Sequence, residues 1–241
     1  MSIYFIMLIL GHKGYSAKYP PNTLRAFLKA IEYGADGVEL DVWRTRDGKI
    51  VVSHDQDLKK VWGVKVDIGK TTYKELLNYE LQGEKIPLLE EVYEHLPDNA
   101  IINVEIKELS VVDDVFKIVK RYNALKRTIF SSFELNALKR LRKMSREVRI
   151  GILTPLGGNT SILGVPYQIL RLDAEFLNTP IQMKKYLGLG RTRSLIKFYR
   201  IFGVKNIFWT VNEIRDIKGL EDLCEILITD EVEKMLSLKK K

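Results

Sequence analysis

The sequence predicts an α/β protein, a (β/α)8 TIM barrel with a small insertion after the second strand. Apolar strand-like segments alternate with helical segments along the whole chain, and eight strand candidates can be counted. The 241 residues are an ordinary length for such a barrel in one domain, which we expect to span residues 1–241. A doubly wound sheet is the alternative, but no glycine-rich dinucleotide fingerprint follows the first strand to support it.

The strand candidates are short apolar runs bounded by turn residues. The first lies in the apolar run 3–10, which lacks the basic start and cleavage site of an export signal and is too short to span a membrane. A buried parallel strand that ends at Gly11 fits this run better. The predicted strands are residues 7–10, 37–42, 101–106, 128–130, 149–153, 176–177, 206–209 and 225–228.

Helical spacing of apolar residues appears between these strands. The first such segment, residues 22–33, opens with the polar capping pair Asn22 and Thr23 and stops at Gly34. The remaining predicted helices are residues 89–96, 111–122, 134–144, 193–202 and 213–220. Residues 47–83 break the alternation, with a hairpin strand at 50–53 followed by a polar, irregular stretch, and we expect them to form an insertion on one rim of the barrel.

Composition limits the class of protein. Apolar residues make up 46% and charged residues 29%, which excludes both a membrane bundle and a disordered chain. A single cysteine, Cys224, excludes a disulfide framework and a thiolate metal cluster, and it favours a reducing, cytoplasmic setting. The net charge of +8 suits a polyanion, but no nucleic-acid-binding motif accompanies it, so we do not expect nucleic acid as a partner.

Acidic residues lie at the carboxyl ends of predicted strands, where barrel enzymes have their catalytic residues. Glu39 and Asp41 are two positions apart on one predicted strand, so both point to the same face. Glu105 on the next parallel strand offers a third oxygen ligand. Three carboxylates without cysteine suit a hard divalent cation, Mg²⁺ or Ca²⁺. The alternative is that Glu39 and Asp41 form salt bridges with lysines at the rim.

Two of the three histidines, His12 and His54, also fall at strand ends. Such a pair can act as general base and general acid, although each residue alone could equally be a structural histidine. His95 lies in a predicted helix, where we expect a structural role. Lys13 and Lys107 place positive charge near the cluster, as binding of a phosphate would require.

Nine short motifs resemble the glycerophosphodiester phosphodiesterase family when they are taken together in this order. The resemblance is dense over residues 11–57 and sparser to residue 230. The motifs are HKG at 12–14, PPNTLRAF at 20–27, GADGVELDV at 34–42, TRDG at 45–48, VVSHD at 51–55, IPLLEE at 86–91, NVEIK at 103–107, WTVN at 209–212 and ITD at 228–230.

The resemblance implies a metal-dependent hydrolase that converts glycerophosphodiesters to glycerol phosphate and an alcohol. It implies that His12 and His54 are catalytic, and that Glu39, Asp41 and Glu105 bind the metal. Lys107 matches a phosphate-neutralising lysine, and Lys13 and Trp209 are expected to contact the substrate. Two positions depart from the family pattern, because Lys13 stands where an arginine is usual and Pro21 where a glutamate is usual. Lysine keeps the charge but loses the two-pronged hydrogen bonding of arginine.

Two further segments raise a question about the substrate. Residues 150–170 contain no charged residue and should lie largely at the rim of the site, and residues 176–212 contain seven basic residues and no acidic one. One interpretation is an ordinary loop and an amphipathic outer helix. The other is an apolar loop that accepts an acyl chain, with peripheral contact to an anionic membrane, as in a lysophospholipase D-like enzyme. A non-catalytic barrel that binds phosphorylated ligands is a third possibility.

Overall fold

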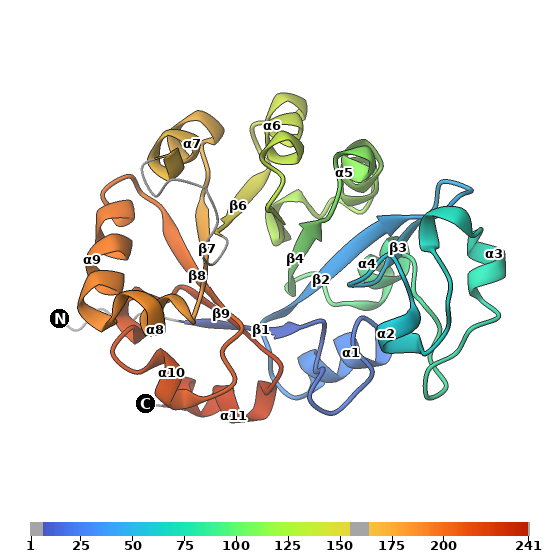
Figure 1. Ribbon diagram of the computed structural model, residues 1–241, viewed down its shortest axis with the longest axis horizontal. Coiled ribbons are helices and arrows are strands. Elements are labelled where there is room, and N and C mark those ends of the chain that lie inside the picture. The colour runs from blue at the N-terminus through green and yellow to red at the C-terminus, as the bar shows by residue number, and fades with distance from the viewer. Residues whose placement is uncertain (1–6, 155–163, 241) are drawn as a thin grey trace.

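The barrel predicted from the sequence is present in the computed structural model, which describes residues 7–154 and 164–240. Within these residues, eight parallel strands follow the order β1, β2, β4, β5, β6, β7, β8, β9, and β1 also pairs with β9, so that the sheet closes on itself. Figure 1 looks onto this ring of strands, with the helices arranged outside it. The α/β class and the (β/α)8 architecture are therefore confirmed.

Each of the eight predicted strands corresponds to one strand of the barrel; the ends agree for residues 101–106 and 149–153 and are shifted for the other six. The end of the first strand was predicted at the turn glycine Gly11, but β1 continues to His12. A Cβ atom on Gly11 would lie 2.6 Å from the carbonyl oxygen of Gly14, so the glycine lets the following turn pack closely against the strand. The barrel strands are β1 Leu8–His12, β2 Gly37–Arg44, β4 Ile101–Ile106, β5 Thr128–Ser132, β6 Arg149–Leu153, β7 Phe176–Pro180, β8 Lys205–Trp209 and β9 Ile226–Thr229.

The outer helices agree less closely with the prediction. Thr23 alone caps the first helix, accepting a hydrogen bond from the Ala26 amide. The helix predicted at 213–220 shrinks to Ile214–Ile217, because the backbone leaves the helical conformation at Lys218 (ψ 125°) and turns through Gly219 (φ +81°). The helices outside the insertion are α1 Leu24–Glu32, α4 Leu89–His95, α5 Val112–Arg121, α6 Leu135–Met144, α7 Gly164–Leu172, α8 Met183–Leu187, α9 Leu189–Arg200, α10 Ile214–Ile217 and α11 Val232–Leu236.

Parts of two apolar runs lie outside the described residues. These are residues 3–6 of the first run and residues 155–163 of the uncharged segment 150–170. The rest of that segment is not the loop we expected, since α7 begins at Gly164, with Pro166 in its first turn, where a proline is tolerated. In the part of the chain that the structure describes, no helix is long and apolar enough to cross a membrane.

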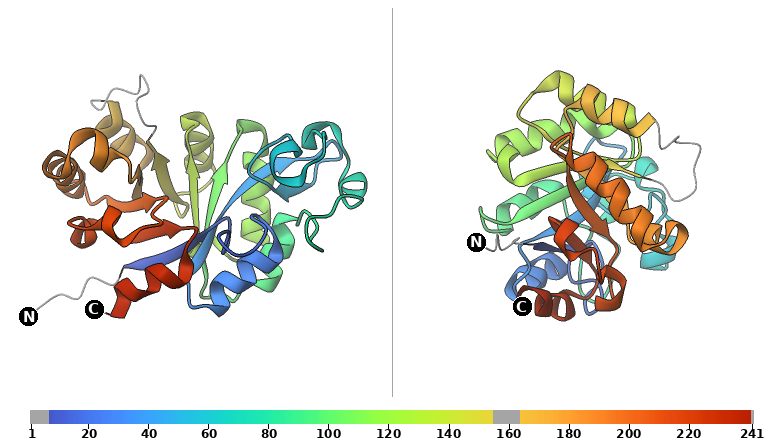
Figure 2. Two further views of the ribbon diagram at one scale, coloured as in Figure 1. Left: turned by 60° about the horizontal axis from the view of Figure 1, so that its bottom comes forward. Right: turned by 90° about the vertical axis from the view of Figure 1, so that its left-hand side faces the viewer.

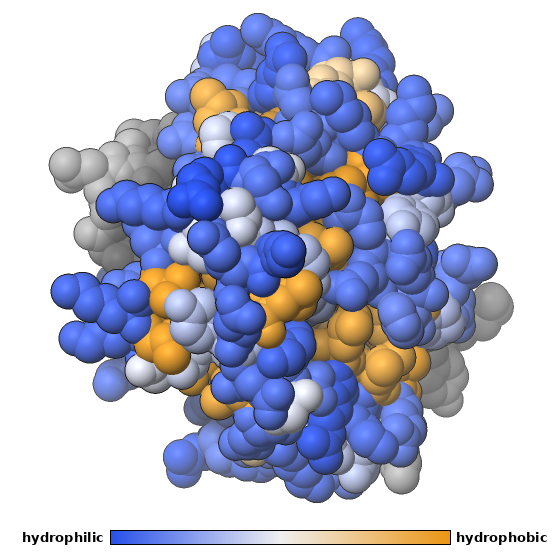
Figure 3. All heavy atoms as spheres, turned by 90° about the vertical axis from the view of Figure 1, so that its right-hand side faces the viewer, coloured by the Kyte–Doolittle hydropathy of each residue, from blue (hydrophilic) through white to orange (hydrophobic). Residues whose placement is uncertain are grey.

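The insertion is more ordered than the sequence suggested. Strand β3 (Ile50–Val52) pairs antiparallel with β2, and the helices α2 (Lys59–Trp62) and α3 (Tyr73–Leu76) follow. They enclose a small core of their own, which includes Leu58, Trp62 and Ile68. Figure 2 shows the insertion standing at one end of the molecule, beside the barrel. Figure 3 shows the side of the molecule that lies on the right in Figure 1, where the insertion stands. On this face, exposed hydrophobic residues form separate small patches among hydrophilic ones.

Alternation of side chains along the strands separates two cores and sets up the site. Val38 and Leu40 of β2 point outward to the helices, in the large cluster between sheet and helices. Their neighbours Glu39 and Asp41 therefore point into the barrel. A second cluster consists of inward strand side chains such as Leu10, Ile207 and Ile228. This apolar plug fills the barrel below the polar residues at the carboxyl ends of the strands.

Candidate active site

One pocket of about 230 Å³ lies at the carboxyl ends of the strands and collects most of the predicted site residues. We call it the carboxylate pocket. Its lining includes both candidate catalytic histidines, all three candidate metal ligands, Lys107 and Trp209, and five further residues to which the sequence analysis assigns no role. The lining is His12, Glu39, Asp41, His54, Asn103, Glu105, Lys107, Phe133, Leu153, Asn178, Trp209 and Ile228.

Strand register brings the three carboxylates together. His12 lies beside Glu39 in the β1–β2 pairing, and Asp41 lies beside Glu105 in the β2–β4 pairing. The ligand oxygens of Glu39, Asp41 and Glu105 all lie within 4.8 Å of one another, and Glu39 and Asp41 are buried. Lys107 Nζ is the nearest counter-charge, 2.8 Å from Asp41 Oδ1 and 2.6 Å from Glu105 Oε1.

The carboxylates carry more negative charge than one lysine can neutralise, and their pKa values show this. Burial, with the charge of Asp41, raises the pKa of Glu39 to about 8, and the same two causes raise the pKa of Glu105. Burial also acts to raise the pKa of Asp41, but the ammonium of Lys107 and the charges of His54 and Lys13 together outweigh it, and the pKa is lowered. Three converging oxygen donors that repel one another are a set that a hard divalent cation fits.

His12 is held from outside the carboxylate pocket by Asp230. Its Nδ1 lies 2.7 Å from Asp230 Oδ1, while its Nε2 lies 3.9 Å from Glu39 Oε2 and so faces the pocket. Burial acts to lower the pKa of His12, but the hydrogen bond with Asp230 and the charge of Glu39 outweigh it, and the pKa is raised. The pKa of Asp230 is lowered, because the hydrogen bond and the charge of His12 outweigh its burial.

The other two histidines lie in different surroundings. His54 follows β3, and its Nδ1 lies 2.8 Å from Asp55 Oδ1, which leaves Nε2 for the pocket. Burial lowers the pKa of His54, and the charge of Asp41 offsets this only in part. His95 ends the outer helix α4 and lies outside the carboxylate pocket, and its Nδ1 is 2.7 Å from the carbonyl oxygen of Glu91.

Lys13 and Trp209 meet the pocket in different ways. Lys13 adopts a left-handed conformation (φ 56°), and its backbone amide donates to Glu39 Oε2 at 3.2 Å. The Lys13 side chain is not part of the pocket lining. Trp209 is, and its indole Nε1 is buried with no hydrogen-bond partner in the described part of the chain.

Sequence reasoning misses the role of three residues that support the site. The sequence pattern indicates a helix cap at Asn22, but this residue adopts a left-handed conformation (φ 58°) and its Nδ2 donates to Asp41 Oδ2 at 3.1 Å. Asp230 and Asn212 follow strands, and the sequence alone assigns them no function. Asn212 Nδ2 donates to Asp230 Oδ2 at 2.6 Å. Two-residue alternation from Ile226 and Ile228 points Asp230 into the barrel, a signal that could have identified it.

The fold and this pocket together define an enzyme class in which a barrel carries acid–base and metal-binding groups at the carboxyl ends of its strands. Residues 12–234 match the model of the glycerophosphoryl diester phosphodiesterase family, and the chain belongs to that family. The match includes His12, Glu39, Asp41, His54 and Glu105. The chain is thus a phosphoric diester hydrolase, which sets aside the non-catalytic barrel as an alternative.

Individual relatives agree with this assignment. A glycerophosphodiester phosphodiesterase of Caldanaerobacter subterraneus is 32% identical, over 97% of this chain and 98% of its own. The crystal structure of a Thermotoga maritima glycerophosphodiester phosphodiesterase superposes with a TM-score of 0.86 at 38% identity, covering 97% of this chain and 98% of that one. An Oleispira antarctica phosphodiesterase in complex with the product sn-glycerol-3-phosphate has the same fold, with a TM-score of 0.85 at 22% identity over 98% of both chains.

Proposed function

We propose that this chain hydrolyses glycerophosphodiesters to glycerol phosphate and an alcohol, with a divalent cation and with His12 and His54 as the acid–base pair. The observation that carries the proposal is the convergence of two histidines, three carboxylates and Lys107 in one pocket. Binding of a phosphate alone would not require this set. The product found in the Oleispira antarctica structure is the one that this reaction would release.

Glu39, Asp41 and Glu105 would hold the cation, which we expect to be Mg²⁺ or Ca²⁺ because all three ligands are hard oxygen donors. When bound, the cation would neutralise negative charge on the phosphate oxygens. Asn22 supports the second of these ligands, since its amide keeps one Asp41 oxygen in place. Removing the positive charge at Lys107 would leave Asp41 and Glu105 facing each other without compensation.

The two histidines would divide the proton transfers between them. Each has a carboxylate partner at Nδ1, which fixes the ring and leaves Nε2 for the reacting groups. The pKa of His12 is raised and that of His54 is lowered. This difference favours His54 as the base that takes a proton from the attacking hydroxyl group, and His12 as the acid that protonates the leaving alcohol. The attacking group is the neighbouring glycerol hydroxyl or a water molecule.

Contacts with the phosphate would come from residues that the pocket leaves available. The Lys107 ammonium can turn from the carboxylates to a non-bridging oxygen, as a point charge. The buried Trp209 Nε1 lacks a partner among the described residues, and a phosphate or glycerol oxygen of the substrate would accept its hydrogen bond. Lys13 would add positive charge at the edge of the site. Burial is the largest cause of the lowered pKa of His54, and the Lys13 ammonium lowers it further, while the charge of Asp41 acts to raise it.

A release assay with sn-glycero-3-phosphocholine tests the proposal directly. We expect glycerol phosphate in the presence of Mg²⁺ or Ca²⁺, and loss of turnover after chelation that the same cation restores. The Glu39→Gln variant, which keeps the shape of the ligand and removes its charge, should stay inactive at the same cation concentration. Full turnover after exhaustive chelation would refute the role of the metal.

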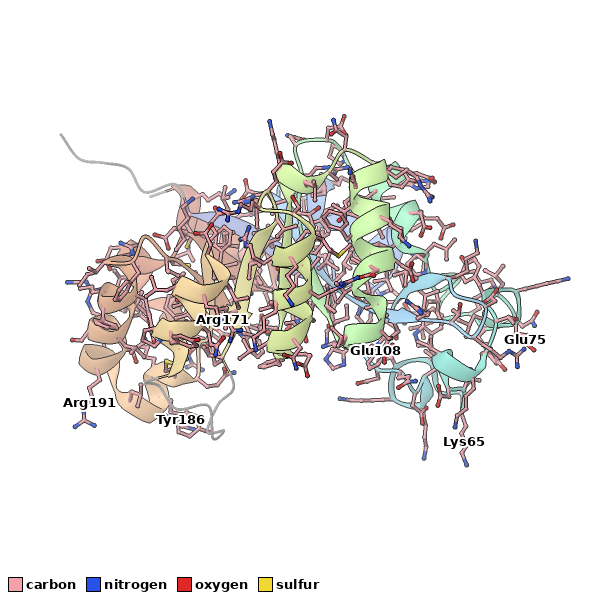
Figure 4. All side chains as sticks on the ribbon, turned by 90° about the horizontal axis from the view of Figure 1, so that it is seen from above. Lys65, Glu75, Glu108, Arg171, Tyr186 and Arg191 are labelled. Carbon is pink, nitrogen blue, oxygen red and sulfur yellow. The ribbon has the colours of Figure 1, made fainter. Side chains whose placement is uncertain are left out.

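We also propose peripheral contact with anionic membranes through residues 176–212, which include α8 and α9. Four of the seven basic residues in this segment are engaged in structural contacts: Lys184 donates to three backbone carbonyls, and Arg193, Arg200 and Lys205 pair with acidic residues. Lys185, Arg191 and Lys197 have no ion-pair partner among the described residues. The exposed Tyr186, 72% accessible, and Arg191 project from the ribbon at the same end of the molecule (Figure 4). A cytoplasmic location remains a prediction from the sequence.

A further inference from the structure

One wall of the carboxylate pocket carries a buried amide that the proposed mechanism does not use. Asn178 of β7 is fully buried and lines this pocket. Its strand stands fourth from β2 in either direction around the ring, so Asn178 lies across the barrel from Glu39 and Asp41. Because its neighbour Leu177 belongs to the outer cluster, alternation directs the Asn178 side chain inward. A fixed polar group therefore faces the candidate metal ligands from the opposite wall.

The Asn178 amide has no protein partner of its own. Neither Oδ1 nor Nδ2 has a hydrogen-bond partner among residues 7–154 and 164–240. The backbone of the same residue is held, since its carbonyl oxygen accepts from the amide and the hydroxyl of Thr154, at 3.1 and 3.0 Å. A buried polar atom that stays unpaired destabilises a fold. An asparagine at this position is thus unfavourable unless a ligand or a water molecule completes its hydrogen bonds.

Gly151 of β6 makes room for this amide. A Cβ atom on Gly151 would lie 2.5 Å from Asn178 Oδ1 and 3.5 Å from Nδ2. The backbone of Gly151 is not left-handed, so its conformation alone does not require glycine, and the close amide does. The two residues form one unit, in which β6 lacks a side chain where β7 presents its amide.

The unpaired atoms on this side of the barrel require a ligand that both donates and accepts hydrogen bonds. Two more buried oxygens, Asn103 Oδ1 and Ser131 Oγ, also lack a partner in the described part of the chain. Ser131 lies beside Gly151 in the β5–β6 register. An amide oxygen only accepts and an amide nitrogen only donates. A phosphodiester has no donor for the oxygens, and a cation has no acceptor for the nitrogen, whereas hydroxyl groups satisfy both kinds of atom.

We propose that Asn178 is a specificity-determining residue that binds the terminal hydroxyl group of the glycerol moiety, in the space that Gly151 leaves open. This inference rests on the proposed function. In that function the phosphate lies at the carboxylates and Lys107, and the hydroxyl beside the ester is a candidate attacking group. The terminal hydroxyl is the remaining polar group of the glycerol. The released alcohol differs between substrates, whereas an enclosed amide at a fixed position fits the part that all of them share.

The test compares two diesters that differ in that hydroxyl alone. They are sn-glycero-3-phosphocholine and its 1-deoxy analogue, the phosphocholine ester of propane-1,2-diol with the same configuration, which keeps the hydroxyl beside the ester. We expect kcat/KM of the wild type to be about 10- to 100-fold higher for the glycerol compound, because the analogue leaves a buried amide unpaired. In Asn178→Leu, which keeps the approximate size and removes the hydrogen bonds, this ratio should fall to about twofold or less. The kcat/KM of the analogue should drop by no more than about threefold.

Asn206→Leu is the matched control for this variant. Asn206 is a buried asparagine on the neighbouring strand β8, outside the pocket lining, and its Oδ1 accepts from Thr179 Oγ1 at 2.6 Å. This control should keep the wild-type ratio but unfold at a lower temperature. Asn178→Leu should unfold at the same temperature as the wild type or a higher one, because an apolar side chain replaces an unpaired amide. A merely structural role of Asn178 would give the opposite shift.

Two further variants keep the test decisive if Asn178→Leu does not fold. Asn178→Ala removes the amide with a smaller side chain, and Gly151→Ala displaces it, so both should lower the ratio to about threefold or less. A wild-type ratio near one would overturn the inference and would show that the amide holds only a buried water molecule. A ratio that persists in the Asn178 variants would overturn it as well.

A binding measurement separates this inference from the proposed function. By calorimetry in the presence of Mg²⁺, sn-glycerol 3-phosphate should bind the wild type at least about tenfold more tightly than its 1-deoxy analogue. Asn178→Leu should remove the difference. This comparison needs no turnover, so it decides the inference even if neither diester is hydrolysed. Equal affinities of the two phosphates in the wild type would refute the contact between Asn178 and the glycerol hydroxyl.

Discussion

His12 Nδ1 and Asp230 Oδ1 are 2.7 Å apart, although 218 positions of sequence separate the two residues. Asp230 is itself held on both oxygens, because Ser16 Oγ donates to Oδ1 and Asn212 Nδ2 donates to Oδ2, each at 2.6 Å. The carboxylate of Asp230 thus holds Nδ1 of His12, and Ser16 and Asn212 hold that carboxylate. The other nitrogen of His12 is directed toward the carboxylate pocket. Replacing such an outer partner commonly lowers activity about 10- to 100-fold.

Replacing Asp230 should therefore impair the chemical step more than substrate binding. We expect Asp230→Asn to lower kcat about 10- to 100-fold, because the amide no longer fixes the tautomer or stabilises the protonated imidazole. KM should change by less than about threefold. Ser16→Ala removes one hydrogen bond to the same carboxylate and serves as the milder control. Unchanged kcat in Asp230→Asn would show that His12 does not depend on this contact.

The histidine assignments predict a sharp contrast between residues of one type. His12→Ala and His54→Ala should each lower the rate about 10²- to 10⁴-fold, the usual range for general acid–base groups. His95→Ala should keep near-normal turnover, since His95 contacts the carbonyl oxygen of Glu91 on an outer helix. The wild-type rate should follow a bell-shaped pH profile. Near-normal turnover in both the His12 and His54 variants would contradict the assignment.

Binding of the cation should be coupled to loss of a proton from Glu39. In the metal-free protein the pKa of this carboxyl is raised to about 8, so at neutral pH the cation competes with a bound proton. The apparent affinity should rise with pH up to about 8, and it should fall about tenfold from pH 7 to pH 6. Calorimetric titration with Mg²⁺ or Ca²⁺ at several pH values measures this. In Glu39→Gln the proton release should disappear, and an affinity of the wild type that is flat from pH 6 to pH 8 would contradict the coupling.

The membrane proposal predicts binding that depends on position as well as on charge. Substituting glutamine for Lys185, Arg191 and Lys197 should abolish sedimentation with vesicles rich in anionic lipid at low salt. The control replaces Lys59, Lys60 and Lys65 on the insertion, which removes the same charge at the opposite end of the molecule (Figure 4). Equal loss in both variants would indicate attraction by net charge alone. No binding of the wild type would refute membrane contact.

A stability prediction follows from the close approach of β2 to the start of β4. A Cβ atom on Gly37 would lie 1.9 Å from the carbonyl oxygen of Ile101, so the backbone would have to move. Gly37→Ala should lower the free energy of unfolding by about 1–3 kcal/mol or more. At Gly190, in α9, a Cβ atom meets nothing within 4 Å, and Gly190→Ala should raise stability by up to about 1 kcal/mol. Chemical denaturation of both variants tests the contrast.

The features that sequence predicts well are those that depend on a regular repeat of side chains. Short apolar runs identify the barrel strands, and two-residue spacing places Glu39 and Asp41 on one face. Local patterns fail to predict structure that depends on residues without a long regular repeat. The insertion core rests on Leu58, Trp62 and Ile68, and only the first two share a helical spacing, over the single turn of α2. The alternation of Ile226 and Ile228 can place Asp230 inside the barrel, but no local pattern encodes its contact with His12 at the other end of the chain.

The pairing of β1 with both β2 and β9 also constrains how the protein is made. During synthesis β2 can dock onto β1 as soon as Arg44 has emerged, but the other edge of β1 has to wait for residues 226–229. Until then the growing chain has an open sheet edge, and His12 lacks the carboxylate that orients it. Ring closure and completion of the active centre are thus the same late event, so a chain that stops before β9 lacks both the closed barrel and the carboxylate that holds His12.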